Sequence, residues 1–197
     1  MSESASSIAK KYLIKMGVEV YTGTAVENND GSTLRLQGGV NIDAKTVIRA
    51  AGITSARIEG LESSVYGRNN RLIVNLHNQV KGYQNIFAVG DNSLVVLPSY
   101  PNGHPQLAQF ALQQAKCLII SLNQLIRNKP LTEFHYIEKG SMATTGRHLA
   151  VADLPFGKFK GYFAWLLWSI VHLLSIIGVK NKLLVLLDWP WKYITYD

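Results

Sequence analysis

The chain has little cysteine, little charge and no secretion signal. Its 197 residues include one cysteine, Cys117, which excludes an internal disulfide framework, a Cys-x-x-Cys dithiol and a cysteine-rich zinc site. Charged residues make up 17% of the chain and hydrophobic residues 47%, a balance that excludes a fully disordered polypeptide. The start, Met1-Ser2-Glu3, lacks the basic residues and apolar run of a signal peptide. These features favour a reducing, cytoplasmic setting.

The net charge is +7, from 20 basic and 13 acidic side chains, and it favours anionic partners. Basic residues are scattered, with no run longer than Lys10-Lys11, so nucleic acid is not an expected partner. Residues 154–197 contribute +3 of the total, from 5 basic minus 2 acidic residues. Because this segment is also aromatic and apolar, we expect it to contact an anionic lipid surface.

Charge is absent from Gly161 to Val179, a stretch of 19 residues. A helix of that length is roughly 28 Å long, about the thickness of a hydrocarbon core. A spanning helix, a helix pair in the membrane interface and a buried core helix all fit this length. The interfacial pair is preferred, because the next apolar run, Leu183–Leu187, is too short to span and the first helix carries a polar seam. The seam consists of Ser169, His172 and Ser175.

Tryptophan and lysine near helix ends are the side chains expected at the level of lipid head groups. The expected membrane-anchor residues are Trp165, Trp168, Lys180, Lys182, Trp189 and Trp191. We therefore expect residues 131–197 to be a membrane-association region with an amphipathic helical anchor. The protein would then be peripheral and monotopic, on the cytoplasmic face of the cell membrane.

The first 52 residues have the pattern of the end of an α/β domain. Apolar residues at helical spacing predict a helix from Ser4 to Met16, which Gly17 ends. A meander of short strands is expected next, with a turn at residues 29–31. Its strands are Val18–Tyr21, Thr24–Glu27, Thr33–Leu36 and Val40–Ile42. A buried strand from Val47, stopped by Gly52, closes this region.

Residues 53–130 have the pattern of part of a second α/β domain. Strands are expected at Leu72–Leu76 and Ile86–Val89, and the second runs into Gly90-Asp91. A long helix is expected from Pro105 to Arg127. Its expected core stripe is Leu107, Ala111, Ala115, Leu118, Leu122 and Leu125.

An Asp that follows a buried strand can accept hydrogen bonds from sugar or polyol hydroxyls. Asp91 has this position, and Gly90 lets the backbone approach a ligand. Pro105 suits the first turn of a helix, whose positive end stabilises an anion such as a reduced flavin. A solvated turn residue or a helix cap is the alternative interpretation of Asp91.

Three glutamines, Gln106, Gln109 and Gln113, share one face of this helix, beside the small residues Ala108 and Ala111. Neutral donors and acceptors flanked by small side chains suit a flat molecule that carries carbonyl groups. A solvated polar face of an amphipathic helix has the same pattern, and both interpretations are kept.

Several strings resemble type II NADH:quinone oxidoreductases, single-subunit respiratory dehydrogenases that do not pump protons. Residues 108–114, AQFALQQ, match their A-Q-x-A-x-Q-Q pattern, and residues 87–91, FAVGD, resemble their carboxy-terminal FAD-binding motif. Gly146-Arg147 matches a Gly-Arg of the family, and residues 164–191 resemble its membrane-anchoring tail. The resemblance implies a partial two-dinucleotide-binding flavoprotein fold of the α/β class. Residues 1–52 would end the NADH domain, and residues 53–130 would belong to the FAD domain.

The same resemblance implies the ligands. FAD would be the cofactor and NADH the electron donor, with Gly90, Asp91, Pro105, Ala108 and Gln109 on the flavin side. A membrane quinone would accept the electrons, in a pocket that Gln113 and Gln114 line together with Gln109. No catalytic side chain is needed, since the flavin carries the redox chemistry. His104 is either an aid to proton delivery or a plain loop histidine, and a homodimer is left open.

The family carries two G-x-G-x-x-G phosphate loops, and this sequence has none. We therefore expect the chain to be the carboxy-terminal part of such an enzyme and to be inactive alone. A non-catalytic, membrane-associated interaction module is the alternative. A sulfide:quinone oxidoreductase would need a pair of redox cysteines, which Cys117 cannot supply alone.

Overall fold

The structure, a computed structural model, describes residues 1–50 and 52–195. It consists of two compact units, of which the first joins Met1–Val47 to Glu138–Asp197 and the second is Ile48–Ile137. The divisions expected at residues 52 and 130 lie close to the bounds of the second unit. The assignment of residues 1–52 to an NADH domain and of 53–130 to an FAD domain stays a prediction.

The first unit begins with helix α1, Glu3–Lys15, which confirms the helix expected there. Ser2 caps it, because its hydroxyl oxygen accepts a hydrogen bond from the Ala5 amide at 3.4 Å. The acidic Glu3 lies in the first turn and the basic Lys15 in the last, as the helix dipole favours.

A small antiparallel sheet follows, with strand order β1-β2-β3. Its strands are β1 Val26–Asn29, β2 Thr33–Leu36 and β3 Asn41–Asp43. The carboxylate of Asp30 closes the first turn by accepting hydrogen bonds from the Ser32 and Thr33 amides at 2.9 and 2.7 Å. These bonds lower the pKa of Asp30. The expected turn and the strand at 33–36 are confirmed, but the strand expected at 18–21 is wrong, since those residues lie outside any ladder.

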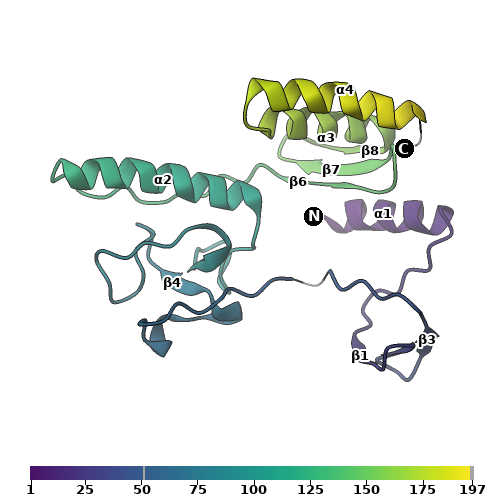
Figure 1. Ribbon diagram of the computed structural model, residues 1–197, viewed down its shortest axis with the longest axis horizontal. Helices are drawn as coiled ribbons and strands as arrows, with labels where there is room; N and C mark the ends of the chain where they lie inside the picture. Colours follow the sequence, from purple (N-terminus) through teal and green to yellow (C-terminus); the bar gives the residue numbers. More distant parts are fainter. Residues whose placement is uncertain (51, 196–197) are drawn as a thin grey trace. The chain divides into compact units, whose positions relative to one another are not determined.

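The second sheet of this unit has the order β6-β7-β8 and is also antiparallel. Its strands are β6 Ser141–Thr144, β7 Ala150–Leu154 and β8 Gly157–Lys160. Helix α3, Gly161–Ser175, packs on one face, where its Ala164 is buried against Ala150 and Ala152. Helix α1 lies against the opposite face, as Figure 1 shows, and the Asp153 carboxylate accepts a hydrogen bond from the Ser2 amide at 2.6 Å.

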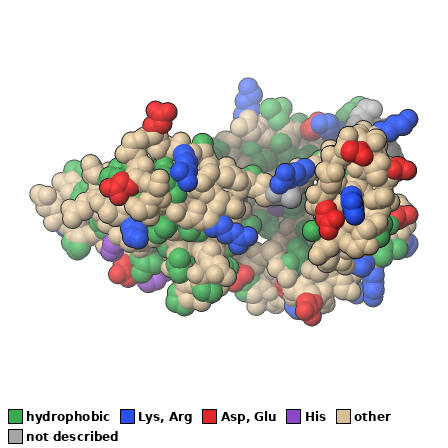
Figure 2. Space-filling model, turned by 90° about the horizontal axis from the view of Figure 1, so that it is seen from below, with side chains coloured by type: hydrophobic (Ala, Val, Ile, Leu, Met, Phe, Trp, Pro, Cys, Tyr) green, Lys and Arg blue, Asp and Glu red, His purple; other side chains and the backbone are tan. Residues whose placement is uncertain are grey.

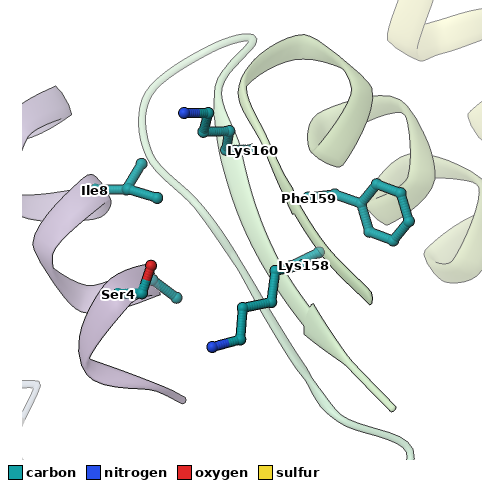
Figure 3. Close-up of a pocket in the computed structure, with 7 residues that line it drawn as sticks. Ser4, Ile8, Lys158, Phe159 and Lys160 are labelled. Atoms are coloured by element: carbon teal, nitrogen blue, oxygen red, sulfur yellow. The ribbon is translucent and has the colours of Figure 1, made fainter. Parts of the chain in front are cut away.

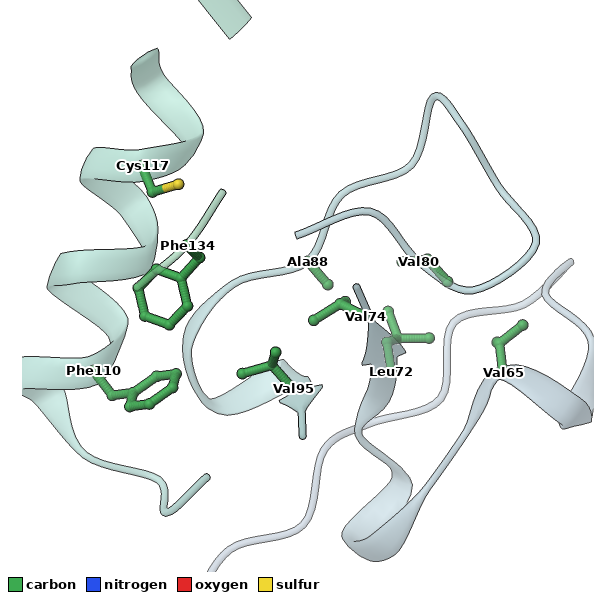
Figure 4. Packing of buried hydrophobic residues seen from close by; sticks show 9 residues of the cluster. All are labelled: Val65, Leu72, Val74, Val80, Ala88, Val95, Phe110, Cys117 and Phe134. Atoms are coloured by element: carbon green, nitrogen blue, oxygen red, sulfur yellow. The ribbon is translucent and has the colours of Figure 1, made fainter. Parts of the chain in front are cut away.

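The second unit contains a parallel pair of strands, β4 Leu72–Val74 and β5 Ser93–Val95, and the long helix α2, Ala108–Ile126. Three 3-10 turns accompany them: η1 Ser63–Val65, η2 Arg68–Asn70 and η3 Gly90–Asn92. Figure 4 shows the core, in which side chains of both strands meet the inward face of α2 and Phe134. Its buried members are Val65, Leu72, Val74, Val80, Ala88, Val95, Phe110, Cys117 and Phe134. The expected α/β class is confirmed.

Two expected strands are absent from the described chain. Residues 47–50 form no strand, and Ile48 has 87% of its surface exposed, because no neighbouring strand pairs with this segment in the part of the chain that the structure describes. The remaining residues of that expected strand include Ala51, which lies outside the described residues. Residues 86–89 form only an isolated bridge from Phe87 to Gln79, and β5 begins after the Gly90 turn instead of before it.

Helix α2 starts three residues later than expected. Pro105 is not in its first turn, because the His104 amide donates to the Val95 carbonyl at 3.1 Å and so holds the chain extended beside β5. Leu107 is the N-cap.

The core face of α2 was predicted only in part, since Ala111, Ala115 and Leu118 are half-buried. Leu107, Leu122 and Leu125 are exposed. The buried face consists of Phe110, Gln114, Cys117 and Ser121. The apolar residues of α2 occur on all of its faces, so their spacing could not identify the face that packs on the core.

Candidate functional site

The turn η3 carries the sequence-predicted Gly90 and Asp91. Gly90 has a φ of +67°, and a Cβ atom there would lie 3.1 Å from the Cβ of Ala111. Glycine is therefore required both by the backbone angle and by the close approach of α2. The Asp91 side chain is exposed at the tip of the turn, while its carbonyl accepts hydrogen bonds from Ser55 Oγ at 3.1 Å and Gln106 Nε2 at 3.2 Å.

Gln114 holds this turn from behind. Its side chain is 0% exposed, and its Oε1 atom accepts hydrogen bonds from the Gly90 amide at 2.7 Å and from Ser93 Oγ at 3.0 Å. Its Nε2 atom donates to Asn78 Oδ1 at 2.9 Å. Gln114 was predicted to line a quinone pocket, and in the structure its side chain is buried and hydrogen-bonded to residues of the same unit. The bond to the Gly90 amide holds this glycine against α2, and the quinone assignment of Gln114 stays a prediction.

A buried cation lies next to this network. The Arg71 side chain donates from Nε to the Ser93 carbonyl at 2.7 Å and from Nη1 to the His104 carbonyl at 2.8 Å. Its Nη2 atom lies 3.0 and 2.9 Å from the two ring nitrogens of His104. Ser93 Oγ also lies 3.0 Å from the Gly90 carbonyl, so its one proton is shared between this oxygen and Gln114 Oε1. Arg71, Ser93 and Asn78 were missed in the sequence, although a charged residue directly before the apolar run 72–74 was a usable signal.

His104 is a core residue and not a surface proton donor. It is 1% exposed, and its ring stacks on Phe110 with a centroid distance of 3.7 Å. Burial lowers its pKa from 6.5 to about 4, and the positive charge of Arg71 acts in the same direction, against the hydrogen bond that the ring donates to the Pro105 carbonyl. The imidazole is thus neutral at pH 7, and the expectation that it aids proton delivery is not supported by its position.

The start of α2 has no side-chain cap. The amides of its first turn therefore keep the positive end of the helix dipole available. Ala108 is exposed and Gln109 half-buried at this end. Gln113, one turn further along, is half-buried and bonded to the backbone of Ile137, donating at 2.9 Å and accepting at 3.0 Å. Gln106 precedes the helix, so the three glutamines do not form one helical row.

The residues of this site fit the flavin end of FAD. An exposed carboxylate on a fixed turn can accept hydrogen bonds from polyol hydroxyls, and an uncapped helix start can donate to a ring carbonyl or an anion. The hydrogen bond from Gln106 Nε2 to the Asp91 carbonyl joins the turn to the segment that leads into α2. Asp91, Ala108 and Gln109 are the residues that would contact such a ligand. In the described part of the chain, no group of three or more potential metal ligands occurs.

The first unit has a shallow pocket of about 220 Å³ between α1 and the edge of β8. In Figure 3 the Lys158 and Lys160 side chains extend toward α1, whereas Phe159 points to the other face of the sheet. The Asp153 carboxylate already bonds the start of α1, and hydrogen bonds from Ser2 lower its pKa. The amino-terminal end of α1 is therefore already occupied by the Asp153 carboxylate. Figure 2 shows basic and acidic side chains interspersed over one face of the molecule.

The carboxy-terminal segment forms two helices, α3 and α4, the latter Val179–Thr195. The Trp168 and Trp189 rings stack at a centroid distance of 5.8 Å and connect the two helices. The Arg147 guanidinium donates to the Lys192 carbonyl near the end of α4, which gives the Gly146-Arg147 motif a structural function.

Much of the apolar surface of α3 and α4 is exposed. Ile177, in the connection between the helices, has 89% of its surface exposed, and Leu187 has 72%. Of the expected anchor residues, Lys180 and Trp191 are exposed, and Trp165, Trp168, Lys182 and Trp189 are partly buried. In the chain as described, residues 1–50 and 52–195, no helix is both long enough and apolar enough to cross a membrane.

Comparisons with known proteins identify the relatives of both parts of the chain. The family model "Pyridine nucleotide-disulphide oxidoreductase" matches residues 1–115, and the model "NDH2 C-terminal domain" matches residues 139–195. The type II NADH:quinone oxidoreductase NdhA of Mycobacterium tuberculosis is 34% identical over 192 residues. That alignment covers 92% of this chain and 40% of the relative.

A type II NADH:quinone oxidoreductase of Staphylococcus aureus is 28% identical over 161 residues, covering 80% of this chain and 39% of the relative. Among solved structures, NDH2 from Plasmodium falciparum in complex with NADH matches with a TM-score of 0.84 and 17% identity. That match covers 98% of this chain and 55% of the other, and it concerns the fold alone. The chain spans about 40% of the length of the curated relatives.

The resemblance to type II NADH:quinone oxidoreductases found in the sequence is confirmed by these relatives. The matched residues 1–115 are more than half of the 197, and they include β4, β5, the Gly90-Asp91 turn and the first turns of α2. The chain belongs to the pyridine nucleotide-disulphide oxidoreductase family.

Proposed function

We propose that this chain is the carboxy-terminal part of an FAD-dependent NADH:quinone oxidoreductase. In that enzyme, electrons pass from NADH to a membrane quinone without proton pumping, and FAD supplies the hydride and electron transfer chemistry when bound. The observation that carries the proposal is the buried network of Arg71, His104, Ser93 and Gln114. It fixes an exposed Asp91 beside an uncapped helix start, in a chain whose curated relatives are NADH:quinone oxidoreductases.

Each part of the site has a proposed task. Asp91 accepts hydrogen bonds from the sugar-alcohol chain of the cofactor, and the first amides of α2 donate to its ring system. Gln109 and Gln113 lie toward the quinone, where neutral amides can bind quinone carbonyls. Gln114 supports the turn from inside. The phosphate groups would be bound by residues outside this chain, since it carries no G-x-G-x-x-G loop.

The helix pair α3–α4 has a separate proposed task, to hold the enzyme on the membrane as a monotopic protein on the cytoplasmic face. Its exposed apolar residues can enter the acyl boundary, while the lysines around it, Lys158, Lys160, Lys180 and Lys182, contact anionic head groups.

The test compares this chain alone with a fusion in which the amino-terminal part of the Mycobacterium tuberculosis relative precedes it. We expect the purified fusion to show a flavin absorbance band and NADH-driven quinone reduction, and the chain alone to show neither. Flavin bound to the chain alone, or a folded fusion without flavin, contradicts the proposal.

Gln113→Ala in the fusion tests the quinone assignment. The KM for quinone should rise about tenfold while NADH-dependent reduction of the flavin stays unchanged, because the contact proposed for this amide is with the quinone and not with the flavin or NADH. Asn123→Ala, an exposed amide further along the same helix, is the matched control. An unchanged KM in Gln113→Ala would remove this residue from the quinone site.

A further inference from the structure

Arg71 combines burial, charge and contacts in a way that structural stability does not explain. Its side chain is 5% exposed, and within the described residues it forms no ion pair. Burial lowers its pKa, and only the more distant charge of Asp91 opposes that effect. Taking a guanidinium out of water is unfavourable, and an apolar side chain of similar volume is often as stable or more stable at such a position. A specific task for the charge and its donors is the simplest reason for an arginine here.

The contacts of Arg71 show what that task is. Nε holds the carbonyl of Ser93, the residue that directly follows the Gly90–Asn92 turn. Nη1 holds the carbonyl of His104, four residues before α2 begins. The guanidinium is planar and rigid, so its two donors set the separation of these two carbonyls. One side chain thereby connects the segment that carries Asp91 with the segment that leads to the start of α2.

His104 adds a third contact to Arg71. Its ring lies between the Nη2 atom of Arg71 and the ring of Phe110, and Phe110 belongs to the first turn of α2. A neutral ring can accept a hydrogen bond from the guanidinium and stack on the aromatic side chain at the same time. The position of α2 is therefore transmitted through Phe110 and His104 to Arg71.

We propose that Arg71 is the positioning residue of the flavin side of this site. By holding the Ser93 and His104 carbonyls, it keeps Asp91 and the first turn of α2 at the separation that the cofactor requires. It does not contact the cofactor itself. The inference rests on the proposed function for the identity of the ligand, and on the hydrogen bonds of this chain for the geometry.

The first experiment needs no cofactor and uses the 197-residue chain. Amide hydrogen exchange is compared in the wild type, in Arg71→Met and in the control Arg68→Met, which changes an exposed arginine three residues earlier. We expect the Gly90 and His104 amides to exchange about tenfold faster or more in Arg71→Met, as the loss of hydrogen bonds to a charged group implies, and the amides of α1 to be unchanged. Equal exchange at Gly90 and His104 in all three proteins overturns the inference that Arg71 holds these two segments together.

The second experiment measures the dissociation constant of FAD, from flavin fluorescence, in the fusion with the amino-terminal part of the relative. We expect about tenfold to hundredfold weaker binding in Arg71→Met, an intermediate value in Arg71→Lys, which keeps one donor point but not the fork, and no change in Arg68→Met. The partial rescue by lysine separates a positioning task from mere filling of space, since methionine fills similar volume.

The outcomes distinguish the two proposals. If the wild-type fusion binds no FAD, the proposed function fails, while the exchange experiment still decides whether Arg71 joins the two segments. If the wild type binds FAD and Arg71→Met binds it equally well, the positioning inference is wrong and the proposed function stands. If Arg71→Met does not fold, as judged by circular dichroism, Arg71→Lys decides: wild-type affinity in that variant overturns the inference.

Discussion

The middle of this chain and its two carboxy-terminal helices use polar and apolar side chains in opposite ways. In residues 48–137 a charged arginine, a histidine, a serine and a glutamine are buried around one turn, inside an apolar shell. In helices α3 and α4 large apolar side chains such as Ile177 and Leu187 are exposed, although lysines surround them. Buried polar groups need fixed partners and so specify one geometry, whereas an exposed apolar face needs a surface that lies outside the chain. The first region is thus suited to hold a ligand precisely placed, and the second to contact a surface.

The chain provides independent probes for this comparison. All four tryptophans, at positions 165, 168, 189 and 191, lie in the first unit, and the single cysteine, Cys117, is buried in the second. Tryptophan fluorescence therefore follows unfolding of the first unit. Labelling of Cys117 with a dithiodipyridine reagent, which reacts with thiols also in acid, follows opening of the second.

The largest expected effect comes from the centre of the second unit. Phe110 is 0% exposed and contacts the rings of His104, Phe134 and Tyr136. We expect Phe110→Ala to lower the free energy of unfolding of this unit by about 3–5 kcal/mol, because it leaves a cavity and removes the stacking partner of His104. Urea dependence of Cys117 labelling measures the change.

Leu112→Ala is the matched control for Phe110→Ala, since Leu112 lies on the same helix with 60% of its surface exposed. It should change the free energy by no more than about 0.5 kcal/mol. The tryptophan transition of the first unit should move little in either variant. Equal effects of the two substitutions would show that the packed face of α2 is not the one described.

The pH dependence of the second unit should be the next largest effect. The pKa of His104 is about 4 in the folded protein against 6.5 in the unfolded chain, so below pH 6.5 the unfolded chain binds a proton that the folded one does not. The contribution of His104 to the free energy of unfolding should be constant above pH 6.5. It should fall as the pH drops toward 4 and level off at lower pH. The total loss is about 3 kcal/mol, at about 1.4 kcal/mol for each pKa unit.

Acid titration of urea unfolding, followed through Cys117, measures this loss. His104→Gln should abolish most of the dependence of the unfolding free energy on pH between pH 6.5 and 4, even if it lowers that free energy at pH 7. His135→Gln replaces an exposed histidine of the same unit and should leave this pH dependence as it is. A pH dependence that persists in His104→Gln would assign the acid sensitivity to other groups.

Elements whose determinants lie within a few residues of one another were predicted well from the sequence. Elements that depend on distant segments of the chain were not. Helix α1, with its cap and charged ends, and the turn at Asn29–Gly31 were found because their determinants lie within a few residues. The Gly90-Asp91 turn was also found, but the strand was placed before it instead of after it. Residues 47–50 are apolar enough for a buried strand, yet a strand also needs neighbours to pair with, and the described chain supplies none.

The candidate site shows the same division. Asp91, Ala108 and Gln109 were predicted from motifs and stay predictions as ligand contacts. The buried side chains around them were not predicted, because Arg71 and Asn78 are distant in sequence from the turn and follow no periodic pattern. Gln114 was assigned to the ligand since it stands beside Gln113 in the motif. A change of 100° per residue around a helix turns one of these neighbours outward and the other into the core.

The smallest expected effect on stability belongs to the tail, and it sharpens the contrast between the two regions. We expect Ile177→Ser and Leu187→Ser to change the unfolding free energy of the first unit by at most about 0.5 kcal/mol each, because both side chains are exposed already. The same pair of changes should weaken binding to vesicles that contain anionic lipid by about tenfold or more, as two buried apolar side chains are lost from the interface. Co-sedimentation of the full chain with vesicles measures this change while β7 and β8, which pack against α3, stay intact. Val96→Ser, at an exposed apolar residue of the second unit, should leave vesicle binding unchanged, and equal binding by all variants would mean that the exposed face of α3 and α4 has a partner other than lipid.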